Sequence, residues 1–174
     1  MTPPTELDRF RSLWNAESEK AVAVMRALPE DQYDFGPDPS GRSLGELAWH
    51  LAEIDACLTF GVATGRFSFA DNPPNLARPK EIKLLAPRYQ QIHEEALARL
   101  ADFDVGRLDE AVSFFDGRAL TLRDVLWTEL LLHLVHHRGQ LTLLCRQAGA
   151  PPPGLFGPNR EEMRAMMEAM QGGG

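Results

Sequence analysis

The stretch "TLRDVLWTELLLHLVHHRGQLTLLCRQ" (Thr121–Gln147) predicts one long helix and indicates which of its faces packs. The helix opens with a Thr121-x-x-Asp124 capping box, in which each side chain accepts a hydrogen bond from the backbone N–H of the other residue. One face recurs at spacings of four and three residues, the period of a helix that packs along a bundle. This stripe consists of Leu126, Leu130, His133, His137, Gln140 and Leu144. Three consecutive positions of the expected core stripe are therefore polar.

Two of these polar residues form a pair of histidines. His133 and His137 are four residues apart, so both rings project from one helix face, as a single metal ion requires. Two interpretations stay open: a metal site, or two core histidines satisfied by carbonyl groups or by Glu129, one turn earlier. His136 lies off the stripe. Arg138 faces away from it, where a surface ion pair or a subunit contact is expected.

A metal site needs a third ligand, and His50 is the best candidate. It lies midway along a second predicted helix, between Leu47 and Ile54, at the edge of an apolar stripe. Facing helices of a bundle could bring it to His133 and His137.

Other residues with chemical potential are assigned structural roles. His93 is expected in solvent, beside Ile92 of a third helix. Cys57 and Cys145 match no CxxC pattern and are expected as reduced, buried thiols. Cys57 lies two turns after His50, which places it near the site, although a core thiol is the commoner role. Gly139 within a helix favours close approach of a neighbouring backbone.

The rest of the chain is also helical in period. Capping residues, turn signals and apolar spacing predict the remaining elements. They are a first helix from Thr5 to Pro29 with a polar step at Glu17, a second from Ser43 to about Gly65, a third from about Pro79 to Phe103, an extended or hairpin element within "AVSFFDGRAL" (Ala111–Leu120), and a short amphipathic helix over about Asn159–Met170. Together these predict an all-α fold, a four-helix bundle with a short extra C-terminal helix and a small hairpin between helices three and four.

Composition narrows the classes of function. The chain of 174 residues is expected to form one domain, 1–174, and its formal net charge of -7 with no Lys/Arg cluster argues against a nucleic-acid partner. No apolar stretch reaches the length of a membrane span, and the N-terminus shows no secretory signal. A cytoplasmic protein without a membrane partner is expected.

Two segments carry a resemblance to a known family. "RSLGELAWHLAEID" (Arg42–Asp55) and "LLLHLVHHRGQLTLLCRQAGAPPPGLFGP" (Leu130–Pro158) resemble the DinB/YfiT-like metalloenzymes. The resemblance extends over nearly the whole chain. It implies an up-down-down-up bundle, often a homodimer, in which His50, His133 and His137 hold one divalent metal ion. His136 corresponds to a position that is not a ligand.

The resemblance also implies a class of activity. Characterised relatives are similar to thiol-dependent transferases and isomerases that use bacillithiol, mycothiol or glutathione. Three imidazoles leave a coordination position open, as in catalytic metal sites, and zinc or nickel is the expected metal. Glu129 and Gln140 are expected to orient imidazole N–H groups or bound solvent, or simply to end the stripe with polar groups.

The expected function is a metal-dependent transferase that joins a low-molecular-weight thiol of the bacillithiol type to a small electrophile. Two alternatives stay open. One is a metal-dependent hydrolase or isomerase that uses metal-bound water. The other is a non-catalytic metal-binding bundle of a DNA-damage-inducible stress response.

Overall fold

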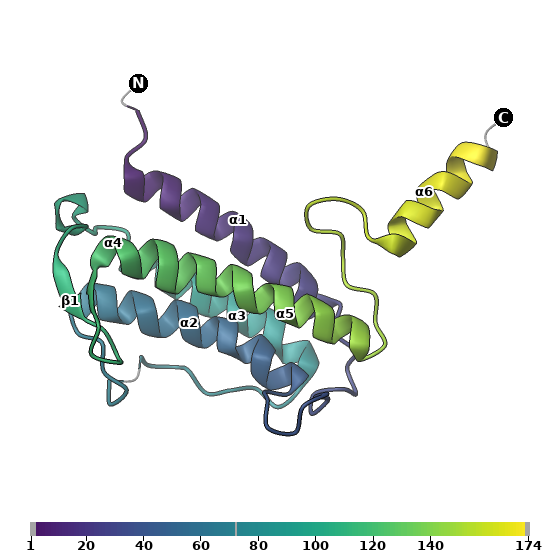
Figure 1. The fold of residues 1–174 in the computed structure, drawn as a ribbon, viewed down its shortest axis with the longest axis horizontal. Helices are drawn as coiled ribbons and strands as arrows, with labels where there is room; N and C mark the ends of the chain where they lie inside the picture. Colours follow the sequence, from purple (N-terminus) through teal and green to yellow (C-terminus); the bar gives the residue numbers. More distant parts are fainter. Residues whose placement is uncertain (1–2, 72, 173–174) are drawn as a thin grey trace.

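The computed structural model describes residues 3–71 and 73–172 (Figure 1). Its elements, in chain order, are α1 (Glu6–Arg26), α2 (Leu44–Thr64), α3 (Ile82–Arg99), η1 (Val105–Arg107), β1 (Ala111–Ser113), β2 (Ala119–Thr121), α4 (Leu122–Asp124), η2 (Val125–Leu132), α5 (His133–Gln147) and α6 (Arg160–Gly172). The segments α4, η2 and α5 follow one another without a break and form a single rod. The predicted all-α fold, with its hairpin and its extra C-terminal helix, is confirmed.

Local sequence accounts for most helix ends. Capping boxes open α1, α2 and α4, as Thr5, Ser43 and Thr121 each exchange hydrogen bonds with the residue three positions later. Helix α2 ends at Gly65, whose φ of 71° is left-handed and favours glycine. Helix α3 begins at Ile82, a few residues after the predicted start near Pro79.

The four rods surround one core. Helix α1 packs against α3 and α5, and α2 packs against α3, η2 and α5. Figure 1 shows that α1 and the α4–α5 rod run in one direction while α2 and α3 run in the other, which is the up-down-down-up order. Because α2 and α3 are parallel, residues 65–81 must return along the length of the bundle before α3 begins. This long connection later supplies one wall of the candidate site.

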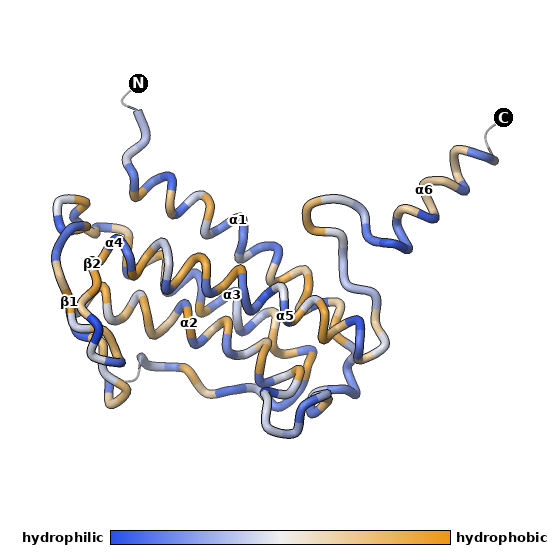
Figure 2. Tube along the Cα trace, viewed as in Figure 1, coloured by the Kyte–Doolittle hydropathy of each residue, from blue (hydrophilic) through white to orange (hydrophobic). Residues whose placement is uncertain are grey.

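Apolar side chains fill the space between the rods. The largest fully buried side chains include those of Phe10, Trp14, Trp49 and Tyr89. Figure 2 shows the alternation of hydrophobic and hydrophilic residues along α1 that makes this burial one-sided. Such burial of apolar area is the main stabilising term of the fold.

A buried ion pair crosses the core between α1 and α5. Glu17 and Arg138 are 6% and 3% exposed, and the Arg138 guanidinium donates to the Glu17 carboxylate and backbone oxygen. The expected surface role of Arg138 is therefore wrong. Arg138 looks solvent-facing when only its own helix is considered, whereas Glu17 is a polar step in an apolar stripe, and the pairing becomes evident only when the helices are placed together. Breaking such a pair strands a buried charge, so both partners should be needed for stability.

The stripe predicted for the fourth helix is displaced. The buried line follows Leu126, Leu130, Leu134, Leu141 and Cys145, with Arg138 between the last leucines. Of the predicted members, Leu126, Leu130 and Leu144 are buried, His133 and His137 are half-buried at the edge of the core, and Gln140 is exposed. Segment η2 is a π-helix, which has more residues in each turn than an α-helix, so the core face falls one residue later than an α-helical period predicts.

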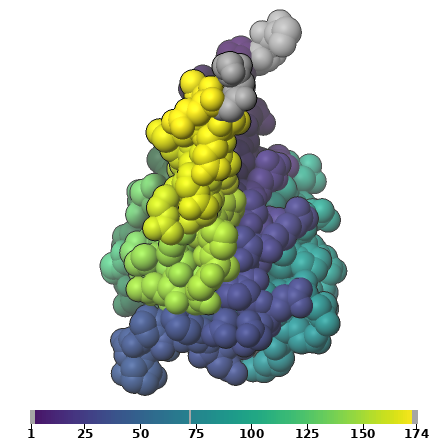
Figure 3. Space-filling model, turned by 90° about the vertical axis from the view of Figure 1, so that its right-hand side faces the viewer, coloured from purple at the N-terminus to yellow at the C-terminus, as the bar shows by residue number. Residues whose placement is uncertain are grey.

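The C-terminal helix stands apart from the bundle. Figures 1 and 3 show α6 projecting beyond the body of the molecule. Its methionines are exposed, and an ion pair between Arg146 and Glu161 ties its first turn to α5. Gly139 is likewise exposed: among the described residues, no atom lies within 4 Å of a Cβ built there. The close backbone approach expected at Gly139 is therefore absent.

Within the described ranges, no helix combines the length and the apolarity that crossing a membrane requires.

Candidate metal centre

Three histidines from two helices meet at one edge of the bundle. His50 projects from α2, and His133 and His137 project from α5. One ligand nitrogen of each ring lies within 4.8 Å of those of the other two. The ring centroids are 5.6 Å apart for His50 and His133, 4.8 Å for His50 and His137, and 4.6 Å for His133 and His137. The structure thus brings together the three residues that the sequence singled out as ligand candidates.

Hydrogen bonds fix the orientation of each ring through its Nδ1 atom. His50 Nδ1 is 2.9 Å from Glu53 Oε2, and His133 Nδ1 is 3.2 Å from the Glu129 carbonyl oxygen. His137 Nδ1 is 2.7 Å from Gln140 Oε1. All three partners are oxygen acceptors, so each Nδ1 carries a proton, and in the neutral ring the lone pair is then on Nε2. This is the tautomer that metal-binding histidines adopt when an outer partner holds the other nitrogen.

The converging Nε2 atoms fit a cation. His133 Nε2 and His137 Nε2 are 2.8 Å apart, and in this tautomer neither has a proton to donate to the other. Two lone pairs that face each other at this distance repel, and a cation bound by both nitrogens removes that repulsion. A divalent ion with nitrogen ligands is such a cation, and three neutral imidazoles are a donor set typical of zinc and its neighbours.

Burial keeps two of the rings neutral. Desolvation is the main cause that lowers the pKa of His133 below its usual value, with the charge of His50 adding to it. Desolvation likewise lowers the pKa of His137 to about 4. Both rings therefore stay unprotonated at neutral pH, and an arriving cation need not displace a proton from them.

Glu53 is part of this centre and was missed by the sequence analysis. It lies one turn after His50 on α2, an i, i+3 spacing that is a recognisable signal once His50 is a candidate. The hydrogen bond from His50 is the main cause that lowers the pKa of the Glu53 carboxyl, with a smaller contribution from the charge of Arg42. Glu53 is thus ionised at neutral pH and remains an acceptor for His50.

Glu129 and Gln140 contact the histidines in different ways. Gln140 uses its side-chain oxygen to hold His137, and its nitrogen lies 3.0 Å from His136 Nε2. Glu129 holds His133 through its backbone carbonyl, while its carboxylate pairs with Arg118 at 3.2 Å.

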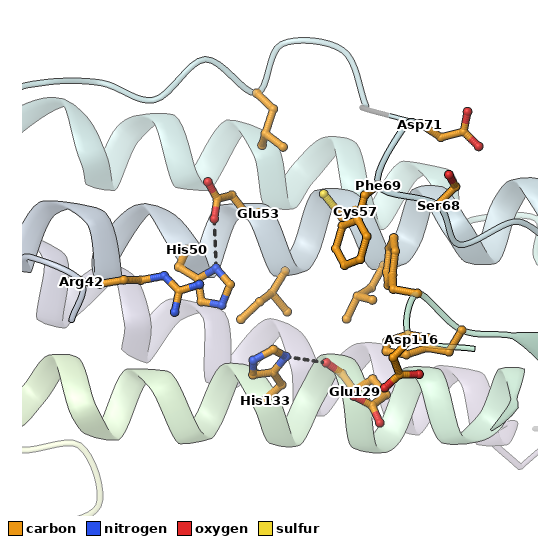
Figure 4. Close-up of a pocket in the computed structure, with 15 residues that line it drawn as sticks. Arg42, His50, Glu53, Cys57, Ser68, Phe69, Asp71, Asp116, Glu129 and His133 are labelled. Atoms are coloured by element: carbon orange, nitrogen blue, oxygen red, sulfur yellow. Dashed lines mark hydrogen bonds and ion pairs between the residues drawn. The ribbon is translucent and has the colours of Figure 1, made fainter. Parts of the chain in front are cut away.

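A cavity of about 520 Å³ adjoins the histidines (Figure 4). Helices α2, η2 and α5, the connection after α2 and the hairpin contribute to its walls. Its lining residues are Arg42, His50, Glu53, Ile54, Cys57, Leu58, Ser68, Phe69, Asp71, Leu76, Phe114, Phe115, Asp116, Glu129 and His133. The volume is in the range of small-molecule sites, and apolar walls with a few convergent polar groups are typical of them.

Cys57 lines this cavity and is half-buried, whereas Cys145 is buried. The expectation of two buried thiols is therefore correct only for Cys145. Burial is the main cause that raises the pKa of the Cys57 thiol, so it remains protonated at neutral pH.

The expectation that His93 is in solvent is wrong. His93 is 6% exposed, and its Nδ1 donates to Asp55 Oδ2 at 2.7 Å. Asp55 projects from α2 and is fully buried. Its carboxylate, which lies 38 residues away in sequence, compensates for burial of the ring.

Comparisons with known proteins agree with the fold and its helix order. The family model described as "DinB family" matches residues 4–170. An uncharacterised protein YrdA of Bacillus subtilis is 27% identical over 157 residues, covering 90% of this chain and 91% of YrdA. The crystal structure of a DinB-like protein from Bacillus cereus is 26% identical with a TM-score of 0.68, covering 84% of this chain and 95% of that one. That of YjoA, a DinB-like protein from Bacillus subtilis, is 21% identical with a TM-score of 0.67, covering 87% and 99%, and shows likeness of fold alone.

Proposed function

The chain belongs to the DinB family, and on that premise we propose that it is a metal-dependent transferase. His50, His133 and His137 hold one divalent ion, zinc or nickel. The enzyme joins a low-molecular-weight thiol of the bacillithiol type to a small electrophile that enters the adjoining cavity. The observation that carries this proposal is the convergence of ligand nitrogens from three histidines beside a cavity of about 520 Å³.

The donor set supports a catalytic rather than a structural ion. Structural zinc is usually enclosed by four protein ligands, whereas three histidines leave a position for an exchangeable ligand. When bound, the ion supplies a Lewis acid and a position at which a thiol ionises readily. The cavity offers room beside that position for an organic molecule.

The chain's own residues orient and shape this site. Glu53, the Glu129 carbonyl and Gln140 hold the three Nδ1 protons, which keeps the Nε2 lone pairs directed at one point. Glu53 is ionised, so its role is to position His50 and not to donate a proton to substrate. Ile54 and Leu58 line the cavity and limit water beside the reacting groups.

Metal titration tests the centre itself. Protein freed of metal by chelation should take up one equivalent of Zn²⁺ or Ni²⁺, measured by calorimetry and by elemental analysis after dialysis. His133→Ala should abolish stoichiometric uptake, because two remaining imidazoles are too few for a stable site. His136→Ala is the matched control and should retain one equivalent. Stoichiometric binding that survives in His133→Ala would contradict the proposal.

An activity assay tests the chemistry. Bacillithiol and an activated aryl halide should form a conjugate faster with zinc-loaded protein than with metal-free protein or with a zinc-containing buffer blank that lacks the chain. Hydrolysis of an ester under the same conditions, without conjugation, would favour the alternative in which water is the reactive group. Binding of metal with neither reaction would favour a non-catalytic bundle.

A further inference from the structure

We propose that the cavity beside the histidines selects an aromatic carboxylate, whose flat ring packs on Phe69, Phe114 and Phe115 and whose carboxylate is bound by Arg42. This inference rests on the proposed function only in taking the bound acid as the molecule joined to the thiol, which requires that the acid carry an electrophilic group besides its carboxylate. The binding step depends on the walls of the cavity and does not require the metal ion.

One end of the cavity is built from phenyl rings. Phe69 is 81% exposed, and its ring lies 4.8 Å from that of Phe115 at an interplanar angle of 31°. Phe114 lies 5.1 Å from Phe115 in an edge-to-face arrangement. The buried Phe67 supports both from behind, at 5.5 Å from Phe114 and 5.7 Å from Phe115. This surface lets a further flat ring stack or pack edge-on, at the centroid separations that aromatic pairs prefer.

The phenyl rings are held in place relative to the histidines. Phe114 and Phe115 precede the turn of the hairpin, where Gly117 has a φ of 84° that suits glycine. Arg118 pairs with Asp116 at 2.6 Å and with Glu129 at 3.2 Å. Since Glu129 lies one turn before His133, these ion pairs tie the hairpin to the helix that carries two histidines. The aromatic end is therefore pre-organised for a ligand.

The histidine end of the cavity favours an anion. Among the acidic side chains of the lining, Asp71 pairs with Arg66 and both Asp116 and Glu129 pair with Arg118, while Glu53 accepts a hydrogen bond from His50. Arg42, by contrast, pairs with no carboxylate within residues 3–71 and 73–172. Figure 4 shows its guanidinium at the same end of the site as His50. An exposed guanidinium without a carboxylate partner is suited to forked binding of a ligand carboxylate.

The cavity extends along α2 for about the length of a small aromatic acid. His50 and Cys57 both line the cavity and are seven residues apart on α2, which corresponds to about 10 Å along the helix axis. A phenyl ring joined to a carboxylate by a two-carbon chain is of similar length. Ile54 and Leu58 also line the cavity from α2 and provide an apolar surface for the ligand.

Three probe molecules separate the contributions of charge and ring. They are 3-phenylpropanoate, the neutral 3-phenylpropanamide, and hexanoate, which keeps the charge and lacks the ring. Dissociation constants are measured by ligand-observed NMR titration on the full chain, both metal-free and zinc-loaded. In the wild-type protein we expect 3-phenylpropanoate to bind about 5-fold more tightly than either of the other probes.

Two substitutions test the two ends, and each has a matched control. Arg42→Gln should remove the preference for the acid over the amide. Phe69→Ala should weaken both aromatic probes about 5-fold and leave hexanoate nearly unchanged. Arg9→Gln, at another exposed arginine, and Phe156→Ala, at a phenylalanine that is 78% exposed outside the cavity, should change none of the constants. All four positions are exposed, and circular dichroism verifies that the variants fold.

The outcomes separate this inference from the proposed function. If the metal-free protein shows the expected probe affinities, the inference is supported even when the chain takes up no zinc. In that case only the proposed function fails. Equal binding of acid and amide to the wild-type protein, persistence of the preference in Arg42→Gln, or an equal loss in Phe156→Ala and Phe69→Ala overturns the inference. So does the absence of saturable binding, even if zinc binds stoichiometrically.

Discussion

Two polar clusters flank helix α2, and they differ in whether the protein itself satisfies their polar groups. The histidine centre consists of His50, His133 and His137, and the buried polar network consists of Asp55, His93, Trp14, Tyr89 and Ser18. His50 and Asp55 are five residues apart on α2, about 140° around the helix, so the clusters face different neighbours. Both place a histidine between helices of an apolar bundle.

The buried polar network is closed. Asp55 accepts from Trp14 Nε1 at 3.0 Å and from His93 Nδ1 at 2.7 Å, and Ser18 donates to the Tyr89 hydroxyl at 2.7 Å. All five side chains are buried. The donors Trp14 Nε1, His93 Nδ1 and Ser18 Oγ each reach an acceptor within the protein, as buried polar groups must if the fold is to be stable.

The histidine centre is open. Its outer Nδ1 atoms are satisfied by oxygen acceptors, while its inner Nε2 atoms converge without a proton between them beside a cavity. A buried histidine is therefore a poor indicator of function by itself. What distinguishes the site is a set of histidine nitrogens from two helices that converge on one point.

The largest difference between the two clusters is expected in how much a substitution in each lowers the free energy of unfolding. Asp55→Ala leaves the donors of His93 and Trp14 buried without an acceptor, so the free energy of unfolding should fall by about 3–5 kcal/mol. His50→Ala in metal-free protein should lower it by less than about 1 kcal/mol, because that ring is only half-buried. Urea unfolding followed by circular dichroism gives both values. A similar loss in both variants would remove the distinction between the clusters.

Zinc should raise the free energy of unfolding only by binding at the histidine centre. At a free zinc concentration 100 times the dissociation constant, the free energy of unfolding of the wild-type protein should rise by about 2.7 kcal/mol. His50→Ala should lose this gain, whereas Tyr89→Phe, which alters the buried polar network, should keep it. The measurement is urea unfolding with and without zinc. A gain of equal size in His50→Ala would place the ion elsewhere.

Alkaline pH should affect the buried polar network. Burial is the main cause that raises the pKa of Tyr89 well above its ordinary value of 10, and the charge of Asp55 adds to it. Above pH 10 the unfolded chain loses the tyrosine proton while the folded protein keeps it. The unfolded state then binds fewer protons, so stability falls as pH rises, by up to about 1.4 kcal/mol per pH unit.

Tyr89→Phe isolates this contribution from those of other groups that titrate at high pH. The variant should show a shallower loss of stability between pH 9 and pH 11, measured by urea unfolding at each pH. Parallel curves for the two proteins would show that Tyr89 ionises equally well in the folded state.

The smallest effect is expected at the third histidine of α5. His136 is exposed, and its contact with Gln140 lies outside the converging nitrogens. His136→Ala should change the free energy of unfolding by less than about 0.5 kcal/mol and leave zinc affinity unchanged. A loss of affinity of 10-fold or more would show that Gln140 needs His136 in order to hold His137.

The sequence predicts features that repeat locally. Apolar periodicity and capping boxes placed the helices, and the four-residue spacing of His133 and His137 together with the position of His50 gave the candidate ligands. A shared face can be inferred from helix geometry because it requires no knowledge of the neighbouring helix. The displacement of the core stripe, by contrast, depends on the π-helical turns of η2, which apolar spacing did not reveal.

Features that depend on distant partners were missed. Arg138 and His93 both look solvent-facing on their own helices, yet Glu17 and Asp55 compensate their burial from other helices. The aromatic end of the cavity was missed for the same reason, since Phe69 and Phe115 meet only when the long connection and the hairpin are placed on the bundle. No local period encodes such pairings.

The histidines and the phenylalanines of the site come from different kinds of structural element, and this affects how its ligand preference can change. The histidines lie on packed helices, whereas Phe69, Phe114 and Phe115 lie in the connection after α2 and in the hairpin. Connecting segments accept substitutions and insertions that packed helices do not. Exchanging these two segments between relatives should therefore transfer ligand preference while the bundle stays folded. Changes in these two segments would therefore alter the range of molecules that the cavity accepts while the three-histidine centre stays in place.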